Sequence, residues 1–347
     1  MSASTSSGWF ASPPPPAAIE ITSHRVTVVA LASGGASRTI TGHSSEPLPA
    51  GVVTPALNAI NIHDPAALGG AIRVALDRLT PRPKRAALIL PDTIGKVSLL
   101  RFEKIPAKAQ ELEQLVRWQM RKAVPFRIEE AQVSWVEGAA VEGGGREYLV
   151  LAARREIVES YEGACDAAGV YAGIVDIASF NLVNAVLATV GGFPAHDPSA
   201  GAGSSQDVSK GDWLLVHTAP ESATLIVVRD GRVIFYRNRP SEGAANELGD
   251  LVHQTAMYFE DRLGGAAFGR VFLAGASAYG PAPEQLRRQI EERLGTRVEP
   301  LDVRGGVSLR DRIAAGPELM DAVAPAVGVL LRDRPVPAAG RGGERVA

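Results

Sequence analysis

Only one of the 347 residues is a cysteine, Cys165, so the chain forms no internal disulfide. No apolar run approaches the ~18–20 residues that a membrane-spanning helix needs, and no basic segment followed by an apolar stretch indicates a signal peptide. The formal net charge is −2, which gives no indication of nucleic-acid binding. These absences favour a protein of a reducing compartment that does not insert directly into a membrane.

Catalytic motifs are equally scarce. The six histidines are scattered, and no pair has the spacing of metal ligands. The sequence has no G-x-S-x-G motif, no Walker A motif and no pair of cysteines. We therefore expect no metal site and no catalytic residue, which favours a protein that is not an enzyme.

What the sequence does contain is an α/β pattern that occurs twice. Residues 17–31, "AAIEITSHRVTVVAL", predict a strand, a short polar turn and a second strand, and residues 213–228 predict the same. A helix is expected over 64–79, with Asp64 as its N-cap, and Asp230-Gly231 is typical of a type I′ hairpin turn. The simplest interpretation is a duplicated α/β architecture.

The composition also divides the chain. Residues 191–212 are rich in Gly, Ser, Ala, Asp and Pro, which predicts a flexible connector between two domains. A terminal helix is expected near the end of the chain, interrupted at Pro325. The predicted parts are a disordered tail over 1–17, a first half over 18–190, the connector, a second half over 213–316, the terminal helix over 317–333 and a second disordered tail over 334–347.

The strongest helical pattern lies in residues 107–126, "AKAQELEQLVRWQMRKAVPF". Trp118 falls outside the centre of its apolar stripe, and Pro125 should end the helix at or near Val124. The stripe itself consists of Leu112, Leu115, Val116, Met120 and Ala123, which recur at helical spacing.

The order of these pieces resembles the actin-like ATPase fold and, more narrowly, the PilM family of type IV pilus assembly proteins, which is related to the cell-division protein FtsA. The stretches that carry the resemblance are "ELEQLVRWQMRKAVPFRIEEAQVSW", "GIVDIASFNLVNAV", "ATLIVVRDGRVIFYR" and "VFLAGASAYGP". The resemblance covers about 18–333. It implies two ribonuclease H-like halves, a subdomain inserted at about 86–153, and a cytoplasmic protein at the face of the inner membrane.

The nucleotide motifs of that fold are degenerate here. The Asp-Ile-Gly of the first phosphate hairpin corresponds to Glu20, Ile21 and Thr22, and the second Asp-x-Gly falls in "VHTA" near His217. Phosphate hairpins need glycine for close backbone approach and a carboxylate for Mg²⁺. The resemblance therefore leaves a degenerate nucleotide site at Glu20, Ser23, Arg25, His217, Gly275 and Ser277. ATP and Mg²⁺ are disfavoured, although an active ATPase or a nucleotide-gated assembly protein is the alternative.

The resemblance also implies a partner. PilM-type proteins hold the cytoplasmic tail of a PilN-type single-pass inner-membrane protein, and act with other pilus assembly proteins. The tail would lie in a groove beside the inserted subdomain, and the candidate wall residues are Trp118, Phe126, Val133 and Trp135. The alternative is that Phe126 plugs the base of the subdomain and that the tryptophans belong to its core.

Overall fold

The computed structural model describes residues 15–32, 38–141, 145–190, 211–240, 245–278, 283–310 and 316–332. The predicted tails and nearly all of the predicted connector over 191–212 lie outside the described residues.

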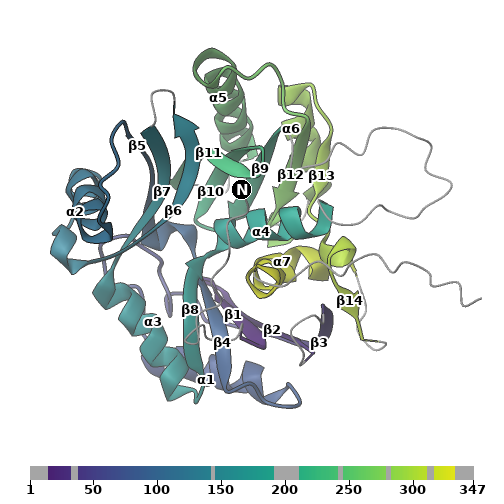
Figure 1. Cartoon of the computed structure of the whole chain (residues 1–347). Helices are drawn as coiled ribbons and strands as arrows, with labels where there is room; N and C mark the ends of the chain where they lie inside the picture. Colours follow the sequence, from purple (N-terminus) through teal and green to yellow (C-terminus); the bar gives the residue numbers. More distant parts are fainter. Residues whose placement is uncertain are drawn as a thin grey trace, which may run out of the picture.

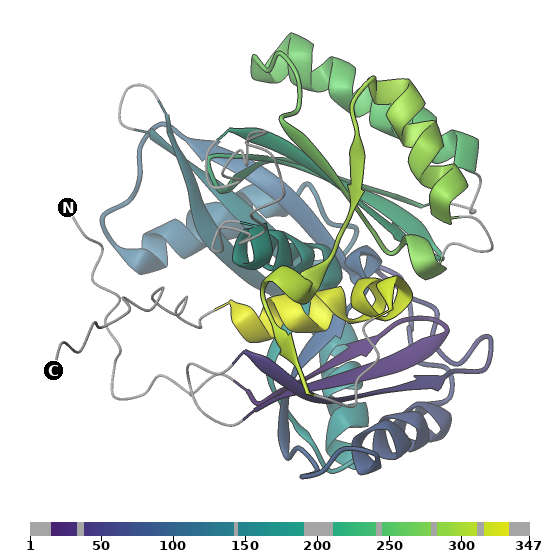
Figure 2. The same cartoon turned by 90° about the vertical axis from the view of Figure 1, so that its right-hand side faces the viewer.

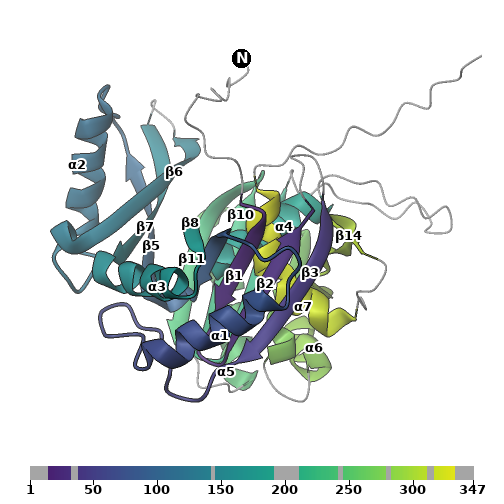
Figure 3. The same ribbon diagram turned by 90° about the horizontal axis from the view of Figure 1, so that it is seen from below.

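The first half is built on a six-stranded sheet with the order β14-β3-β2-β1-β4-β8 (Figure 1). Its strands are β1 (Ala17–Ile21), β2 (Arg25–Leu31), β3 (Thr39–Pro47), β4 (Arg85–Leu90), β8 (Tyr171–Ile177) and β14 (Ser308–Leu309). Helices α1 (Pro65–Asp77) and α3 (Arg155–Ala167) cover one face, as Figure 3 shows. The expected N-cap is present, since Asp64 accepts a 2.9 Å hydrogen bond from the Ala67 N–H.

The second half is built on a five-stranded sheet with the order β11-β10-β9-β12-β13. Its elements are β9 (Asp212–Ala219), β10 (Ser222–Arg229), β11 (Arg232–Pro240), β12 (Arg270–Ala274) and β13 (Val298–Pro300), with helices α5 (Ala245–Leu263) and α6 (Pro283–Leu294) on the outer face. The turn between β10 and β11 has φ values of 49° at Asp230 and 71° at Gly231, as the predicted type I′ turn requires.

Two helices lie between these sheets, α4 (Ala178–Val190) and α7 (Pro317–Leu331) (Figure 2). The layers therefore alternate helix, sheet, helix, sheet, helix. Strand β1 is buried on both faces: Ala18 packs into the central core with α4 and α7, and Ile19 packs into the outer core with α1 and α3. Cys165 is buried in that outer core, where burial raises the pKa of its thiol to about 12.

Helix α7 packs against α4, β1 and β2, which brings the end of the chain back to the first half. It runs without a break through Pro325, so the predicted interruption there is wrong. The helix tolerates this proline because α7 is packed between the two sheets, and this packing stabilises it. At Gly328 the contact with α4 is so close that a Cβ atom would lie 1.8 Å from the Asn181 carbonyl oxygen.

The inserted subdomain is a three-stranded sheet with the order β5-β7-β6 and one helix, α2 (Ala109–Met120). Its strands are β5 (Gly95–Phe102), β6 (Ala131–Val141) and β7 (Gly145–Arg154). The subdomain begins at Gly95 and not at residue 86, because β4 pairs with β1 and β8 of the first sheet. Helix α2 ends at Met120, before the expected Val124, since Pro125 sets only the outer limit of the helix.

Candidate functional site

The degenerate nucleotide motifs meet between the two halves. The turns of the β1–β2 and β9–β10 hairpins and the loop after β12 face α7 around a cavity of about 40 Å³. Four of the residues expected at the nucleotide site line it: Glu20, Arg25, His217 and Gly275. Ser23 lies instead in a neighbouring depression of about 330 Å³, which also contains Glu221.

Asp321 of α7 caps two backbone N–H groups of the loop after β12. Its two carboxylate oxygens accept hydrogen bonds from the Gly275 N–H at 2.7 Å and the Ser277 N–H at 2.8 Å. Gly275 has a φ of +79°, and a Cβ atom there would lie 2.0 Å from the Thr218 carbonyl oxygen, so only glycine fits. The loop donates its amide groups to a side chain of the same protein.

A second carboxylate, Asp92, joins the two halves. It follows β4 in a short helix, η1 (Asp92–Ile94), and is buried. One carboxylate oxygen accepts a hydrogen bond from the Ser179 N–H of α4 at 2.9 Å. The other accepts a hydrogen bond from the Thr224 hydroxyl of β10 at 2.6 Å and lies 3.1 Å from His217 Nδ1 of β9. Asp92 and Asp321 were not expected from the sequence, because neither belongs to a motif that the resemblance identifies.

The electrostatics of this cluster follow from burial and from these bonds. Burial alone would raise the pKa of Asp92, but the hydrogen bond and the charge of His217, together with Thr224, outweigh it and lower the pKa. Burial alone would lower the pKa of His217, but the bond to Asp92 and its charge raise it. The two side chains therefore form a buried ion pair across the two halves.

Glu20 behaves differently. Burial raises the pKa of its carboxyl group, and Arg25 and His217 only partly oppose this effect. Its Oε2 atom has no hydrogen-bond partner among the described residues. Burial therefore favours the neutral form of the Glu20 carboxyl group at the β1–β2 turn.

Space and free hydrogen-bond donors are limited at this cleft. Ligand pockets usually enclose about 300–1,000 Å³, whereas the cavity here holds about 40 Å³, the space of a water molecule. No group of three or more His, Cys, Asp or Glu side chains in the described ranges is arranged to hold a metal ion. The amide groups that would meet an anion are already bonded to Asp321.

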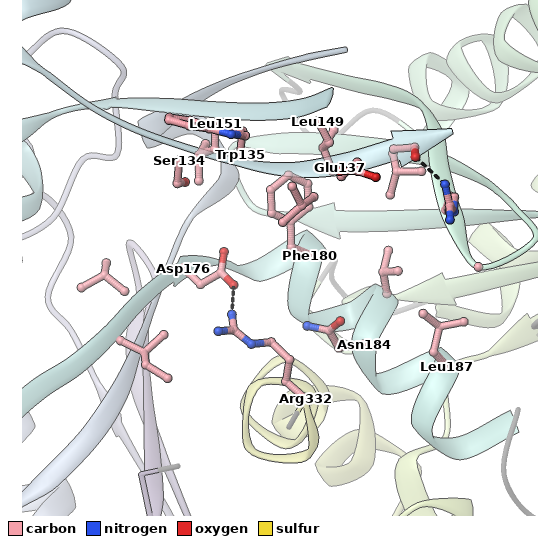
Figure 4. A pocket seen from close by; sticks show the side chains of 18 residues that line it. Ser134, Trp135, Glu137, Leu149, Leu151, Asp176, Phe180, Asn184, Leu187 and Arg332 are labelled. Carbon is pink, nitrogen blue, oxygen red and sulfur yellow. Dashed lines mark hydrogen bonds and ion pairs between the residues drawn. The ribbon is translucent and has the colours of Figure 1, made fainter. Parts of the chain in front are cut away.

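A much larger groove, of about 630 Å³, lies between the inserted subdomain and the central helices (Figure 4). Two edge strands border it: β6 pairs only with β7, and β8 pairs only with β4, among the strands that the structure describes. The side chains of the β6–β7 sheet that line it include Ser134, Val136, Leu149 and Leu151, and those of α4 include Phe180, Val183 and Leu187. A smaller cavity beside Gln132 and Ile177 extends the groove along both strands.

Charged groups lie at the border of this groove. Asp176 of β8 and Arg332 form an ion pair at 3.3 Å, which Figure 4 shows to the left of the labelled α4 side chains. Burial raises the pKa of Asp176, and Arg332 opposes this effect. Across the groove, the Arg232 guanidinium donates a hydrogen bond to the Gly138 carbonyl oxygen and thereby holds the β10–β11 turn against β6.

The predicted wall residues do not gather in this groove. Trp135 is among its lining residues but also packs against the core under α2, whereas Trp118, Phe126 and Val133 do not line it. Phe126 and Val133 pack into the core under α2, on the opposite face of the three-stranded sheet, and Trp118 points outward from α2. Strand alternation could have separated Val136 from Trp135, but it could not show which face α2 covers.

Two duplicated α/β halves around a shared cleft, with a subdomain inserted into the first, define the actin-like ATPase fold. The chain belongs to the family of the type IV pilus assembly protein PilM, whose model matches residues 18–262.

One solved structure supports this fold at a TM-score above 0.5. The chain is similar to a PilM–PilN type IV pilus biogenesis complex, with 18% identity and a TM-score of 0.76 over 92% of this chain and 99% of that chain. It is also similar to the ethanolamine utilization protein EutJ from Carboxydothermus hydrogenoformans, with 11% identity and a TM-score of 0.46 over 92% of this chain and 90% of that chain. The cytoplasmic domain of EpsL from Vibrio cholerae matches with 8% identity and a TM-score of 0.43 over 74% of this chain and 80% of that chain.

No curated protein matches the sequence significantly. Within the described ranges, no helix has both the length and the apolar character needed to cross a bilayer.

Proposed function

We propose that this protein is a cytoplasmic platform of type IV pilus assembly that binds the cytoplasmic tail of a PilN-type inner-membrane protein. The observation that carries the proposal is the groove of about 630 Å³ between β6 and β8. The solved structure with the same fold is that of a PilM–PilN complex, which supports a partner of this type. The platform lies at the inner membrane because its partner is anchored there.

The groove has the two properties that recognition of an extended peptide needs. Edge strands offer backbone N–H and C=O groups to an added strand, and both β6 and β8 are edge strands among those described. Apolar side chains on both sides offer pockets for alternate side chains of the peptide. Val136 is 62% exposed in the groove, which is unusual for a valine and fits a surface that a partner covers.

The platform works without ATP hydrolysis in this proposal. Three observations support a cleft that is closed by its own side chains. The cavity is small, Asp321 accepts a hydrogen bond from the loop after β12, and burial raises the pKa of Glu20. The ion pair between Asp92 and His217 replaces a bound nucleotide as the contact that joins the halves.

The test is a binding titration in solution with a fluorescent peptide copied from the N-terminal tail of the single-pass membrane protein encoded beside this chain. Val136→Glu places a charge at an exposed position of the apolar groove and should weaken binding by at least about tenfold. Because the valine is largely exposed, the thermal midpoint should change little.

Tyr171→Ala is the matched control. Tyr171 is 60% exposed at the start of β8 but does not line the groove, so its variant should bind the peptide as the wild type does. Equal affinity of the wild type and Val136→Glu, or no saturable binding of the tail peptide by the wild type, would contradict the proposal.

A further inference from the structure

The outer face of α2 carries an exposed tryptophan. The buried face of this helix is formed by Val116 and Met120, and 3.6 residues per turn place Trp118 on the opposite side. Its side chain is 57% exposed. Large aromatic side chains are usually buried in part against a neighbour, and Figures 1 and 3 both show α2 at the outer edge of the molecule, with its far side turned away from the rest of the chain.

The residues around this tryptophan are basic. Arg121 and Lys122 follow it by three and four positions, at the end of the helix: Arg121 is the C-cap of α2 and keeps helical backbone angles, and Lys122 lies in the turn that follows. Both are exposed, and neither has an ion-pair partner among the described residues, whereas Arg117 pairs with Glu113 and Lys108 with Glu111.

The surrounding segment has the opposite charge to the rest of the chain. Residues 101–127 contain seven basic and three acidic side chains, a net charge of +4, although the whole chain has a formal net charge of −2. The remainder therefore carries −6. The positive charge of residues 101–127 attracts an anionic surface, whereas the negative charge of the remainder is repelled by that surface. The charge distribution therefore orients the protein.

We propose that the outer face of α2 and the turn after it form a membrane contact, in which Trp118 enters the headgroup region and Arg121 and Lys122 bind anionic lipid headgroups. Tryptophan favours this interface because its ring is apolar and its N–H is polar. The proposal rests on the proposed function, since a platform held by the tail of a membrane protein lies within reach of the bilayer. The lipid contact at α2 is then added to the contact with the partner's tail peptide. Two weak contacts together hold a protein at a membrane more firmly than either does alone.

The experiment measures binding of the full chain to vesicles in the absence of any partner. Vesicles that contain phosphatidylglycerol should bind the protein at low salt, and vesicles of phosphatidylcholine alone should not. Each basic side chain near an anionic surface strengthens partitioning by about fivefold, so the double variant Arg121→Gln/Lys122→Gln should lose about 25-fold. Trp118→Ala should weaken binding by a factor that salt does not change, because its contribution is not ionic.

Trp118→Phe supplies a direct readout. It keeps an aromatic ring and should still bind, but the blue shift of tryptophan emission on vesicle addition should disappear, because the reporting ring has been removed. The matched charge control is Arg288→Gln/Arg297→Gln, which removes two exposed arginines of the second half and should leave vesicle binding unchanged. All of these positions are exposed, so thermal midpoints should stay close to that of the wild type.

Three results would overturn the proposal: no preference for anionic vesicles, equal binding by the Arg121→Gln/Lys122→Gln variant, or self-association that Trp118→Ala abolishes, which would make this face a contact between copies of the chain. The outcome is separable from that of the proposed function. The α2 variants should bind the tail peptide normally in solution, and Val136→Glu should bind vesicles normally.

Discussion

His217 Nδ1 and Asp92 Oδ2 lie 3.1 Å apart, although 125 positions separate them in the sequence. The carboxylate also accepts the hydroxyl of Thr224, so one buried acid of the first half holds two strands of the second. Breaking a buried ion pair by removing one partner commonly costs about 3–5 kcal/mol. This pair is therefore one of the contacts that fix the relative position of the two halves.

Replacement of this histidine should make stability depend on pH in a defined direction. The pKa of His217 is raised in the folded protein, so its stabilising charge is fully present below its unfolded pKa of about 6.5 and is lost as pH rises through the folded value. The pKa of Asp92 is lowered, so this carboxylate stays ionised throughout. His217→Gln should destabilise the protein most near about pH 6 and progressively less toward about pH 9.

Urea unfolding of the wild type and of His217→Gln over this range measures the difference. His253→Gln is the control, because His253 lies on the exposed side of α5. A difference between the wild type and His217→Gln that grows with rising pH would contradict the charged pair.

Replacement of Glu20 by glutamine should stabilise the protein at neutral pH. Burial raises the pKa of this carboxyl, and its Oε2 atom has no hydrogen-bond partner among the described residues. Because the pKa of Glu20 is higher in the folded protein, the free energy of unfolding falls as pH rises above the unfolded pKa of about 4.3. Glu20→Gln should therefore add about 1–3 kcal/mol to the free energy of unfolding at pH 7, and nothing below about pH 4.

Urea titrations at both pH values check this prediction. The reverse result, a loss of stability at neutral pH, would show that the ionised carboxylate is needed in the cleft, as a bound cation would require.

Close packing of α7 on α4 gives a third prediction. A Cβ atom at Gly328 would lie 1.8 Å from the Asn181 carbonyl oxygen, so Gly328→Ala must displace one of the central helices. Overpacking of this kind costs about 1–3 kcal/mol. Gly70→Ala in α1 is the matched control, because a Cβ atom there meets nothing within 4 Å. That variant should instead gain about 0.5–1 kcal/mol from the helix preference of alanine.

Thermal unfolding of the two variants separates these effects. If Gly328→Ala were as stable as Gly70→Ala, α7 would not be packed on α4 as described.

The features that the sequence predicted correctly are those decided by neighbouring residues. The Asp64 cap and the Asp230-Gly231 turn depend on backbone geometry within a few positions. The course of the chain through Pro325 was mispredicted, because two sheets hold that helix in a way that no local rule contains.

The sites depend on contacts between distant segments, which a single sequence does not specify. Glu20, Arg25, His217 and Gly275 were expected together because the family resemblance placed them together. Asp92 and Asp321 were missed, since each makes its bonds far from its own position in the chain. Three of the four wall residues expected from the sequence lie outside the groove of about 630 Å³, because alternation along β6 separates two faces without telling which one the helix covers.

The last prediction concerns ATP, which should not bind in the micromolar range. A micromolar dissociation constant needs about 8 kcal/mol of favourable interaction, and the cavity of about 40 Å³ offers neither the volume nor free loop amides, because Asp321 already accepts from Gly275 and Ser277. A micromolar site would stabilise the folded protein by about 4 kcal/mol at about 1 mM Mg-ATP, which is a thousandfold excess over such a constant. We expect instead no change in the urea midpoint and no saturable heat in a calorimetric titration. A shift of the expected size with Mg-ATP, absent with the same concentration of Mg²⁺ and inorganic phosphate, would show that the cleft opens to admit the nucleotide and that the platform is gated by it.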